Sequence, residues 1–314
     1  MFQQSKKKFA VIFAFMLFTS LSFADEGMWT FDNPPRKLLK EKYGFEPTQE
    51  WLDHIRLSSV RFNDGGSGSF ISSNGLVMTN HHVASGQLQK LSNEKKDYAK
   101  DGFFANTFSE EIKCTDLELN VLISMENVTD KVLSVIKKEM SDKEAYDARK
   151  SKIAELTKES TEKTGLRSDI VELYQGGEYW IYRYKKYTDI RLVMAPEHQI
   201  AFFGGDADNF TYPRYNLDMT FFRVYENDKP IQSSHYLKWN TNGAKENELV
   251  FVSGHPGSTN RLQTISQLEN QRDFIQDLKK HRAQHADYLN DKKERIEALT
   301  LSIQSLDAPR IIDI

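Results

Sequence analysis

The sequence predicts a mainly β fold with added helices. Short apolar runs, bounded by glycine, asparagine or proline, recur before Arg261 and are typical of strands. Two longer stretches, near 128–165 and from Leu262 onward, instead carry apolar residues at helical spacing among many lysines and glutamates. With 314 residues, 39% of them hydrophobic and 28% charged, the chain is long enough for one large domain or two.

Composition excludes several classes of protein. The mean hydropathy of −0.60 excludes a polytopic membrane protein, and an aromatic content of 12% excludes a wholly disordered chain. Because Cys114 is the single cysteine, there is no intrachain disulfide and no cysteine-based zinc site. A net charge of −3 gives no electrostatic reason to expect a nucleic-acid partner. No metal or other cofactor is expected.

The first two dozen residues have the pattern of a secretory signal peptide. Lysines at 6–8 precede the apolar run 9–18, which is too short to span a bilayer comfortably. Ser22 and Ala24 place small residues at the −3 and −1 positions of a cleavage site. We expect residues 1–24 to be removed and the mature protein to work in the periplasm, without stable membrane association. The alternative is an uncleaved anchor helix.

The region after the signal peptide is predicted to be mostly strands. A short helix near 38–53 follows the break at Pro34 and Pro35. Turn signals occupy 63–66, and Ser73 with Asn74 suits the turn of a hairpin. In chain order, the expected strands are 58–62, 67–72, 75–79, 117–125, 179–184, 189–194, 218–225 and 248–252.

Helical periodicity predicts the remaining elements. Residues 128–164 should form one or two amphipathic helices, with an N-cap at Thr129 or Asp130 and a C-terminal stop at Gly165. Residues 262–306 contain no glycine or proline and should form one long helix or two. A helix this charged needs a partner surface for stability. The sequence thus divides into a β region at 25–261 and a helical region at 262–314.

The most informative segment is 66–84, where a glycine-rich strand, a turn and a second strand lead into Thr79-x-x-His82. Serine peptidases of the chymotrypsin type present their general base in this way from the first of two barrels. His82 directly precedes the small apolar Val83, as the catalytic histidine of this pattern does, so we assign the role to His82 and expect His81 to be a neighbour that packs or hydrogen-bonds. The alternative is a pair of ordinary loop histidines.

A histidine base needs a carboxylate that fixes its tautomer. Asp218 opens an apolar strand, where a carboxylate would be held rigidly, so we expect it within about 3.5 Å of a His82 ring nitrogen. Asp206 and Asp208 resemble a piece of a calcium loop but lack its later ligands, and we assign them as loop carboxylates. The alternative for Asp218 is a charge at a strand edge.

No serine stands where this fold requires its nucleophile. The Gly-x-Ser-Gly turn expected well after Asp218 does not occur, and Ser253 and Ser258 have glycine on one side only. Ser67 and Ser69 lie in a glycine-rich stretch but precede His82, which would reverse the order of the triad. We therefore expect the nucleophile to be absent from this chain.

The sequence resembles the bacterial dipeptidyl-peptidase family that includes dipeptidyl-peptidases seven and eleven, periplasmic exopeptidases of the chymotrypsin clan. Several independent motifs carry the resemblance in one order along the chain. They are 25–29, 31–35, 66–82, the 204–214 block, Asp218 with 222–225, and 254–261.

The resemblance implies a double β-barrel with a helical domain inserted between the barrels. Residues 25–261 would be the first trypsin-like barrel, with a helical insertion near 128–165, and 262–314 the beginning of the helical cap. Such enzymes release dipeptides from peptides with a free N-terminus and can be homodimers. Asn209 and Phe210 match an Asn-Trp pair that helps to hold the substrate α-amino group. Phenylalanine there keeps the apolar wall but lacks the indole N–H donor.

The sequence also departs from the family pattern, which changes the expected activity of this chain. Family members are more than twice as long, and their nucleophile lies in the second barrel, so we expect this chain to be an N-terminal part that is inactive alone. One alternative is a non-catalytic periplasmic peptide-binding remnant. Another is an endopeptidase of the heat-shock protease type, which shares Thr-Asn-x-His-Val but gains no support from the 204–214 block or the long C-terminal helix.

Overall fold

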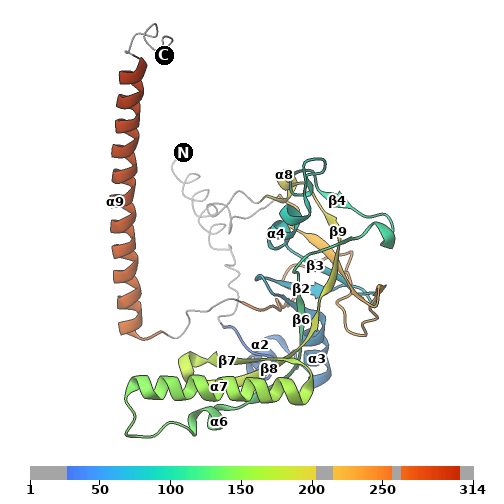
Figure 1. Ribbon diagram of the computed structural model, residues 1–314. Helices are drawn as coiled ribbons and strands as arrows, with labels where there is room; N and C mark the ends of the chain where they lie inside the picture. Colours follow the sequence, from blue (N-terminus) through green and yellow to red (C-terminus); the bar gives the residue numbers. More distant parts are fainter. Residues whose placement is uncertain (1–26, 203–214, 257–262, 305–314) are drawn as a thin grey trace, which may run out of the picture. The chain divides into compact units, whose positions relative to one another are not determined.

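The structure is a computed structural model that describes residues 27–202, 215–256 and 263–304. It divides into two compact units, Met1–Gly257 and Ser258–Ile314 (Figure 1). The predicted signal peptide at 1–24 lies outside the described residues. In the described part of the chain, no helix is both long and apolar enough to cross a membrane.

The strands of the first unit close into a small antiparallel barrel. β1 pairs with β2, β2 with β3, β3 with β10 and β10 with β9. The segment that contains β5 and β6 closes the ring, since β5 pairs with β9 while β6 pairs with β1. The strands are β1 Ser59–Phe62, β2 Ser67–Phe70, β3 Leu76–Thr79, β5 Ile112–Lys113, β6 Leu119–Asn127, β9 Asp189–Ala195 and β10 Thr220–Glu226. The predicted mainly β fold with added helices is confirmed.

The barrel encloses one apolar core. Phe62 and Phe222 meet across it with ring centroids 5.9 Å apart. Val60, Val77 and the other inward residues of the same strands surround these rings, with essentially no exposed surface. Cys114 is a buried free thiol in this core, and burial raises the pKa of the thiol to about 12. A thiol this hard to ionise is a packing residue.

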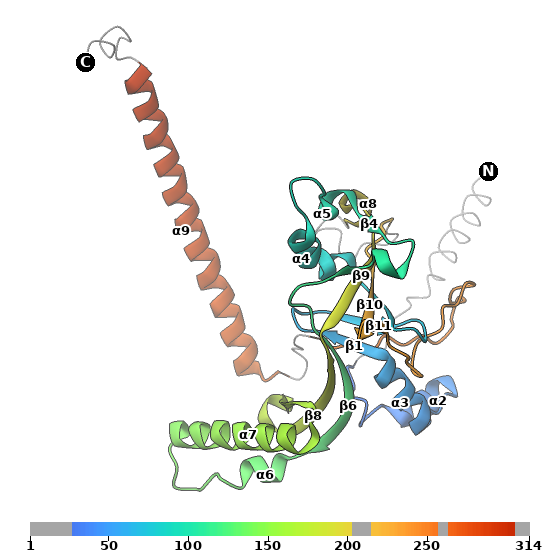
Figure 2. The ribbon, with the colours of Figure 1, turned by 45° about the vertical axis from the view of Figure 1, so that its right-hand side comes forward.

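Long strands continue the same sheet beyond the barrel. β6 continues into pairing with β8 (Glu178–Tyr187), which pairs with β7 (Arg167–Leu173). The helices α6 (Thr129–Leu133) and α7 (Asp142–Thr164) pack on this extension, which we call the arm (Figure 2). The arm has its own small core, made of Val128, Val132, Leu156, Tyr179 and Ile181.

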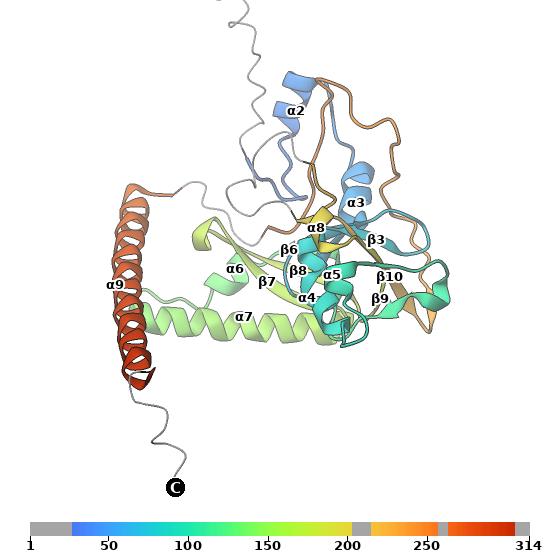
Figure 3. The same cartoon turned by 90° about the horizontal axis from the view of Figure 1, so that it is seen from above.

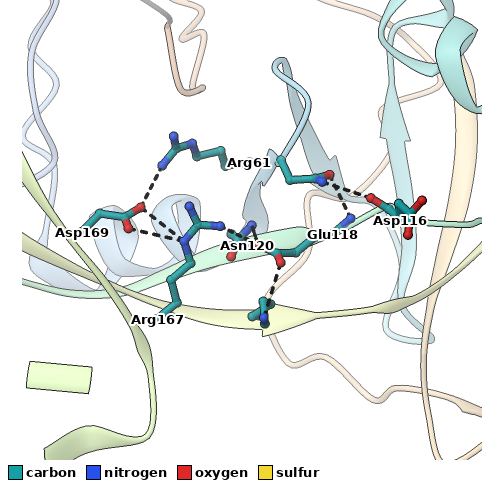
Figure 4. A network of polar contacts seen from close by, with 8 residues as sticks. Arg61, Asp116, Glu118, Asn120, Arg167 and Asp169 are labelled. Carbon is teal, nitrogen blue, oxygen red and sulfur yellow. Dashed lines mark hydrogen bonds and ion pairs between the residues drawn. The ribbon is translucent and has the colours of Figure 1, made fainter. Parts of the chain in front are cut away.

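A polar network fastens the arm to the barrel (Figure 4). Arg61 on β1 lies 3.3 Å from the carboxylate of Asp169 on β7. Arg167, also on β7, donates to Glu118 at 2.5 Å, and Asn120 on β6 donates to the same carboxylate oxygen at 2.9 Å. Each of the two carboxylates, Asp169 and Glu118, contacts two basic side chains, so neither is left unpaired.

Short elements complete the first unit. α4 (His81–Leu91) contacts α5, and α5 contacts α8, so these helices gather at one end of the barrel (Figure 3). The other short elements are α5 Tyr98–Asp101, α8 His198–Ala201, β4 Phe103–Phe104, β11 Lys229–Pro230, and the 3₁₀ turns Phe108–Glu110 and Tyr174–Gly176.

The first predicted helix is two helices. α2 (Arg36–Tyr43) ends at Gly44, which has φ of 65°, and α3 (Gln49–Ser58) begins after Thr48, whose hydroxyl accepts from the Trp51 amide at 3.1 Å. Glycine in the left-handed region is a common helix stop, and threonine is a favoured N-cap. The strand expected from Ser58 consequently begins one residue later.

Two helices lie within 128–165, as predicted, but the predicted N-cap is wrong. Gly165 ends α7 with φ of 67°, as predicted, but Thr129 lies inside α6. The cap of α7 is Ser141, which forms a capping box with Glu144. Helix α4 and strand β7 had not been predicted, because both are mixed in polarity.

The strand predicted at 248–252 is wrong. These residues belong to no strand, and Val252 is 100% exposed. Phe251 instead packs against Phe45 and Trp51, with ring centroids 5.3 and 5.1 Å apart. An apolar run becomes a strand only where a neighbouring edge offers hydrogen bonds. Here aromatic packing holds the run against Trp51 of α3 and against Phe45, which follows the Gly44 cap of α2.

The second unit is described as one helix, α9, which spans Ile265–Gln304. The predicted long helix is thus single. Thr264 precedes it and accepts from the Gln267 amide at 3.3 Å. Apolar side chains in its first half are exposed, with Ile265 at 76% and Phe274 at 64%.

Candidate active site

Two neighbouring strands bring the candidate site together. β3 and β10 run antiparallel, and their pairing ends at Thr79 opposite Thr220. The residues just beyond that pair are Asn80 and His82 on one side and Asp218 on the other. Strand register therefore sets which side chains can meet at this end of the barrel.

His82 and Asp218 make two hydrogen-bonding contacts. The Nδ1 atom of His82 lies 2.7 Å from Oδ2 of Asp218, and the His82 backbone amide donates to Oδ1 at 3.1 Å. The predicted contact between His82 and Asp218 is thus confirmed. The His82 side chain is 56% exposed, whereas that of Asp218 is 14% exposed. The carboxylate is therefore partly desolvated, and the imidazole is open to the solvent.

The carboxylate also lies at the start of α4. This helix begins at His81, and the His82 amide that donates to Asp218 is one of its otherwise unpaired N–H groups. A negative charge at the N-terminus of a helix is stabilised by the helix dipole. Asn80 adds a third donor, since its Nδ2 lies 3.3 Å from Oδ2 of Asp218.

His81, unlike His82, is buried. It is 5% exposed, and its Nε2 has no hydrogen-bond partner in the structure. Burial lowers the pKa of His81, although the nearby charge of Asp218 opposes this shift. Its ring lies 6.4 Å from that of His198 on α8. His81 is therefore a packing residue, which is one of the two roles predicted for it.

An open depression of about 480 Å³ lies beside His82. Glycines at 65, 66 and 86 contribute no side chains to its wall. Its lining residues are Asp64, Gly65, Gly66, His82, Val83, Ser85 and Gly86.

Two of the serines weighed as nucleophiles, Ser67 and Ser253, have structural contacts. The Ser67 hydroxyl accepts from the His255 amide at 2.7 Å. The Ser253 hydroxyl lies 2.8 Å from that of Ser59. These contacts attach the segment around Ser253 to β1 and β2.

Several predicted residues lie outside the described part of the chain. They are the proposed amine-binding Asn209 and Phe210, together with Asp206, Asp208 and Ser258. Among the residues that are described, no group of three or more histidine, cysteine, aspartate or glutamate side chains could hold a metal ion. Sequence reasoning missed Asn80, although its place directly before the His-His pair could have indicated it.

The whole described chain resembles one family. The sequence profile of peptidase S46 matches residues 24–303, so the chain belongs to the peptidase S46 family. Dipeptidyl-peptidase 7 from Capnocytophaga gingivalis is 35% identical over 265 residues, which is 79% of this chain and 37% of that protein. The Asp/Glu-specific dipeptidyl-peptidase from Porphyromonas gingivalis is 28% identical over 298 residues, 87% of this chain and 41% of that protein.

Solved structures agree with the family. The crystal structure of Porphyromonas endodontalis DPP11 in complex with the dipeptide Arg-Asp has a TM-score of 0.61 and 27% identity, covering 71% of this chain and 35% of that one. The same protein in complex with substrate has a TM-score of 0.59. The chain thus spans about two fifths or less of the relatives it matches.

Proposed function

We propose that this chain carries the general base and its orienting carboxylate for a serine-type dipeptidyl-peptidase. The observation that supports this most directly is the contact between His82 Nδ1 and Asp218 Oδ2 at 2.7 Å. With Nδ1–H donated to Asp218, Nε2 carries the lone pair that takes a proton from a serine hydroxyl. Asp218 then stabilises the imidazolium that forms.

The proposed substrate is a peptide with a free N-terminus, from which a dipeptide is released. Similarity to the dipeptidyl-peptidases supports this substrate class. Asn209 would hold the α-amino group through its side-chain carbonyl, and Phe210 would form an apolar wall beside it. The depression next to His82 would receive the chain near the scissile bond.

The nucleophile in this proposal lies outside residues 1–314. Ser67 and Ser253 are held in structural contacts, which argues against either as the nucleophile. Residues 25–261 would then form the first trypsin-like barrel and 262–314 the beginning of a helical cap. We further propose export to the periplasm with cleavage after Ala24, and a possible homodimer of the whole enzyme.

The test is hydrolysis of fluorogenic dipeptidyl substrates by the product of the whole reading frame that contains these residues. That product should cleave peptides with a free α-amino group, fail on N-blocked ones, and lose turnover on His82→Ala. Residues 1–314 alone should show none. Equal cleavage of blocked peptides would refute the exopeptidase assignment. Turnover by 1–314 that disappears on Ser67→Ala would place the nucleophile at Ser67 instead.

A further inference from the structure

Asn80 occupies a helix cap position without acting as a cap. It precedes α4, yet its side chain makes no capping hydrogen bond. Asparagine is among the best N-cap residues because its side-chain oxygen accepts from the first turn of the helix. At this terminus the Oδ1 of Asp218 accepts from the His82 amide instead.

The Asn80 amide is used as a donor to Asp218. Its Nδ2 lies 3.1 Å from the backbone oxygen of Asp218 and 3.3 Å from Oδ2 of the same residue. Because one NH₂ group contacts both the main chain and the carboxylate, it restricts rotation of the carboxylate about its side-chain torsions. The oxygen it contacts is also the one that faces His82 Nδ1.

We propose that Asn80 is a positioning residue, which holds the Asp218 carboxylate so that Oδ2 stays aligned with His82 Nδ1. The inference rests on the proposed function of His82 and Asp218. Asn80 acts through Asp218 and contacts no reacting atom. Its local preference for capping is given up for this contact, and departures of that kind concentrate at functional sites.

The variant Asn80→Ser distinguishes a role in positioning Asp218 from a role in capping α4. Asn80→Ser keeps a favoured N-cap residue, so a purely structural role would be preserved. The shorter hydroxyl loses the two-point contact with Asp218. Asn63→Ser is the matched control, because Asn63 also makes two side-chain hydrogen bonds, at 3.1 and 2.9 Å, and neither involves His82 or Asp218.

Ring ¹⁵N NMR on residues 1–314 reads the tautomer of His82 without needing turnover. In the spectrum of the neutral ring, recorded at a pH where histidine is deprotonated, the unsubstituted protein and Asn63→Ser should carry the His82 proton on Nδ1 and show a low-field Nδ1 proton signal. Asn80→Ser should lose that proton signal and populate both tautomers. An unchanged tautomer and signal in Asn80→Ser would overturn the proposal.

Kinetics of the whole enzyme supply an independent readout. Asn80→Ser should lower kcat roughly tenfold, the scale expected for a misaligned catalytic group, and leave KM within about twofold. A change confined to KM would overturn the positioning role. If the whole enzyme has no peptidase activity, the proposed function fails, whereas the NMR outcome still decides whether Asn80 aligns Asp218.

Discussion

The Asp218 carboxylate is the most constrained side chain of the candidate site. It accepts from the His82 amide, the His82 ring and the Asn80 amide, at 3.1, 2.7 and 3.3 Å. Two of these donors belong to His82 and one to Asn80, and together they hold the carboxylate against the His82 ring. In a catalytic triad, a carboxylate in this position fixes the histidine proton on Nδ1, which is the tautomer a general base requires.

Replacement of this carboxylate by an amide should remove its function with little change in shape. Asp218→Asn can offer an N–H to His82 Nδ1, which would move the ring proton to Nε2. We expect kcat of the whole enzyme to fall about 10⁴-fold, as known for the equivalent change in a chymotrypsin-type triad. Asp228→Asn is the control, because Asp228 is 90% exposed and pairs with Arg191 on β9. A loss below tenfold would contradict the role of Asp218.

Gly66 is required for the packing of the candidate site. It has φ of +98°, and an added Cβ would lie 2.7 Å from Cγ2 of Val83. Gly66→Ala should therefore lower the free energy of unfolding, measured in urea, by about 2–4 kcal/mol, from the strained φ and the clash together. Gly65→Ala is the control for the strained φ alone, since Gly65 has φ of +99° and no atom within 4 Å of an added Cβ. The difference between the two losses of stability is then the cost of the clash. Equal losses for the two variants would show that Val83 plays no part.

Sequence reasoning at this scale identified residues with a strong local signature. Thr79-x-x-His82 indicated the proposed base, and the apolar strand after Asp218 indicated its proposed partner, so the contact between these two residues was predictable. Asn80 was not, because its contact with Asp218 spans 138 residues and depends on the register of β3 and β10. The structural contact of Ser67 depends on a segment 188 residues away and was equally hidden.

Elements were predictable where one period dominates. The long helix α9 follows directly from the period of its apolar residues, whereas the hairpin of β2 and β3 was predicted from the turn signal at Ser73 and Asn74. The first residues of α4 contribute to the site more than to an apolar face, so the apolar pattern of this helix is weak. The error at 248–252 has the opposite cause, because an apolar pattern was present but no strand edge was available.

The capping box of α7 offers a test at the scale of one element. Ser141 accepts from the Glu144 amide, and Glu144 accepts from the Ser141 amide at 2.8 Å. Ser141→Ala should destabilise the chain by about 1 kcal/mol. Hydrogen exchange should rise in α7 and not at α4, since the arm has a core separate from that of the barrel.

A suitable control for that experiment is Ser134→Ala. Ser134 is an exposed serine after α6, whose hydroxyl donates to the Lys131 carbonyl at 2.8 Å. It should leave stability within about 0.5 kcal/mol, as is usual for surface sites. Faster exchange throughout the barrel in Ser141→Ala would mean that the arm and the barrel unfold together.

In the first unit as a whole, one long segment ties distant elements together. The Ser233 amide donates to the Ser73 carbonyl and the Leu237 amide to the Phe70 carbonyl, both at 2.8 Å. Further along, the His255 amide donates to Ser67 at 2.7 Å. Residues 233–255 therefore cross the β2–β3 hairpin that leads to His82. No local pattern predicts such a crossing, since each contact joins residues more than 150 positions apart.

His255 should make the stability of this unit depend on pH. Both of its ring nitrogens are buried without a hydrogen-bond partner, and its ring lies 6.3 Å from that of Tyr184. Burial, with a smaller contribution from the charge of Arg61, lowers the pKa of His255 from 6.5 to about 4. Between these two values the unfolded chain binds a proton that the folded chain does not.

The sign of the effect follows from that difference. The contribution of His255 is fully present above about pH 6.5 and is lost as the pH falls toward 4, a change of roughly 3 kcal/mol at most. His255→Phe keeps an apolar ring that needs no partner, so urea unfolding between pH 4 and 7 should show a flatter profile than the unsubstituted chain. His281→Gln on α9, which belongs to the other unit, should leave the slope unchanged. An identical slope in His255→Phe would mean that other groups govern the acid sensitivity of this unit.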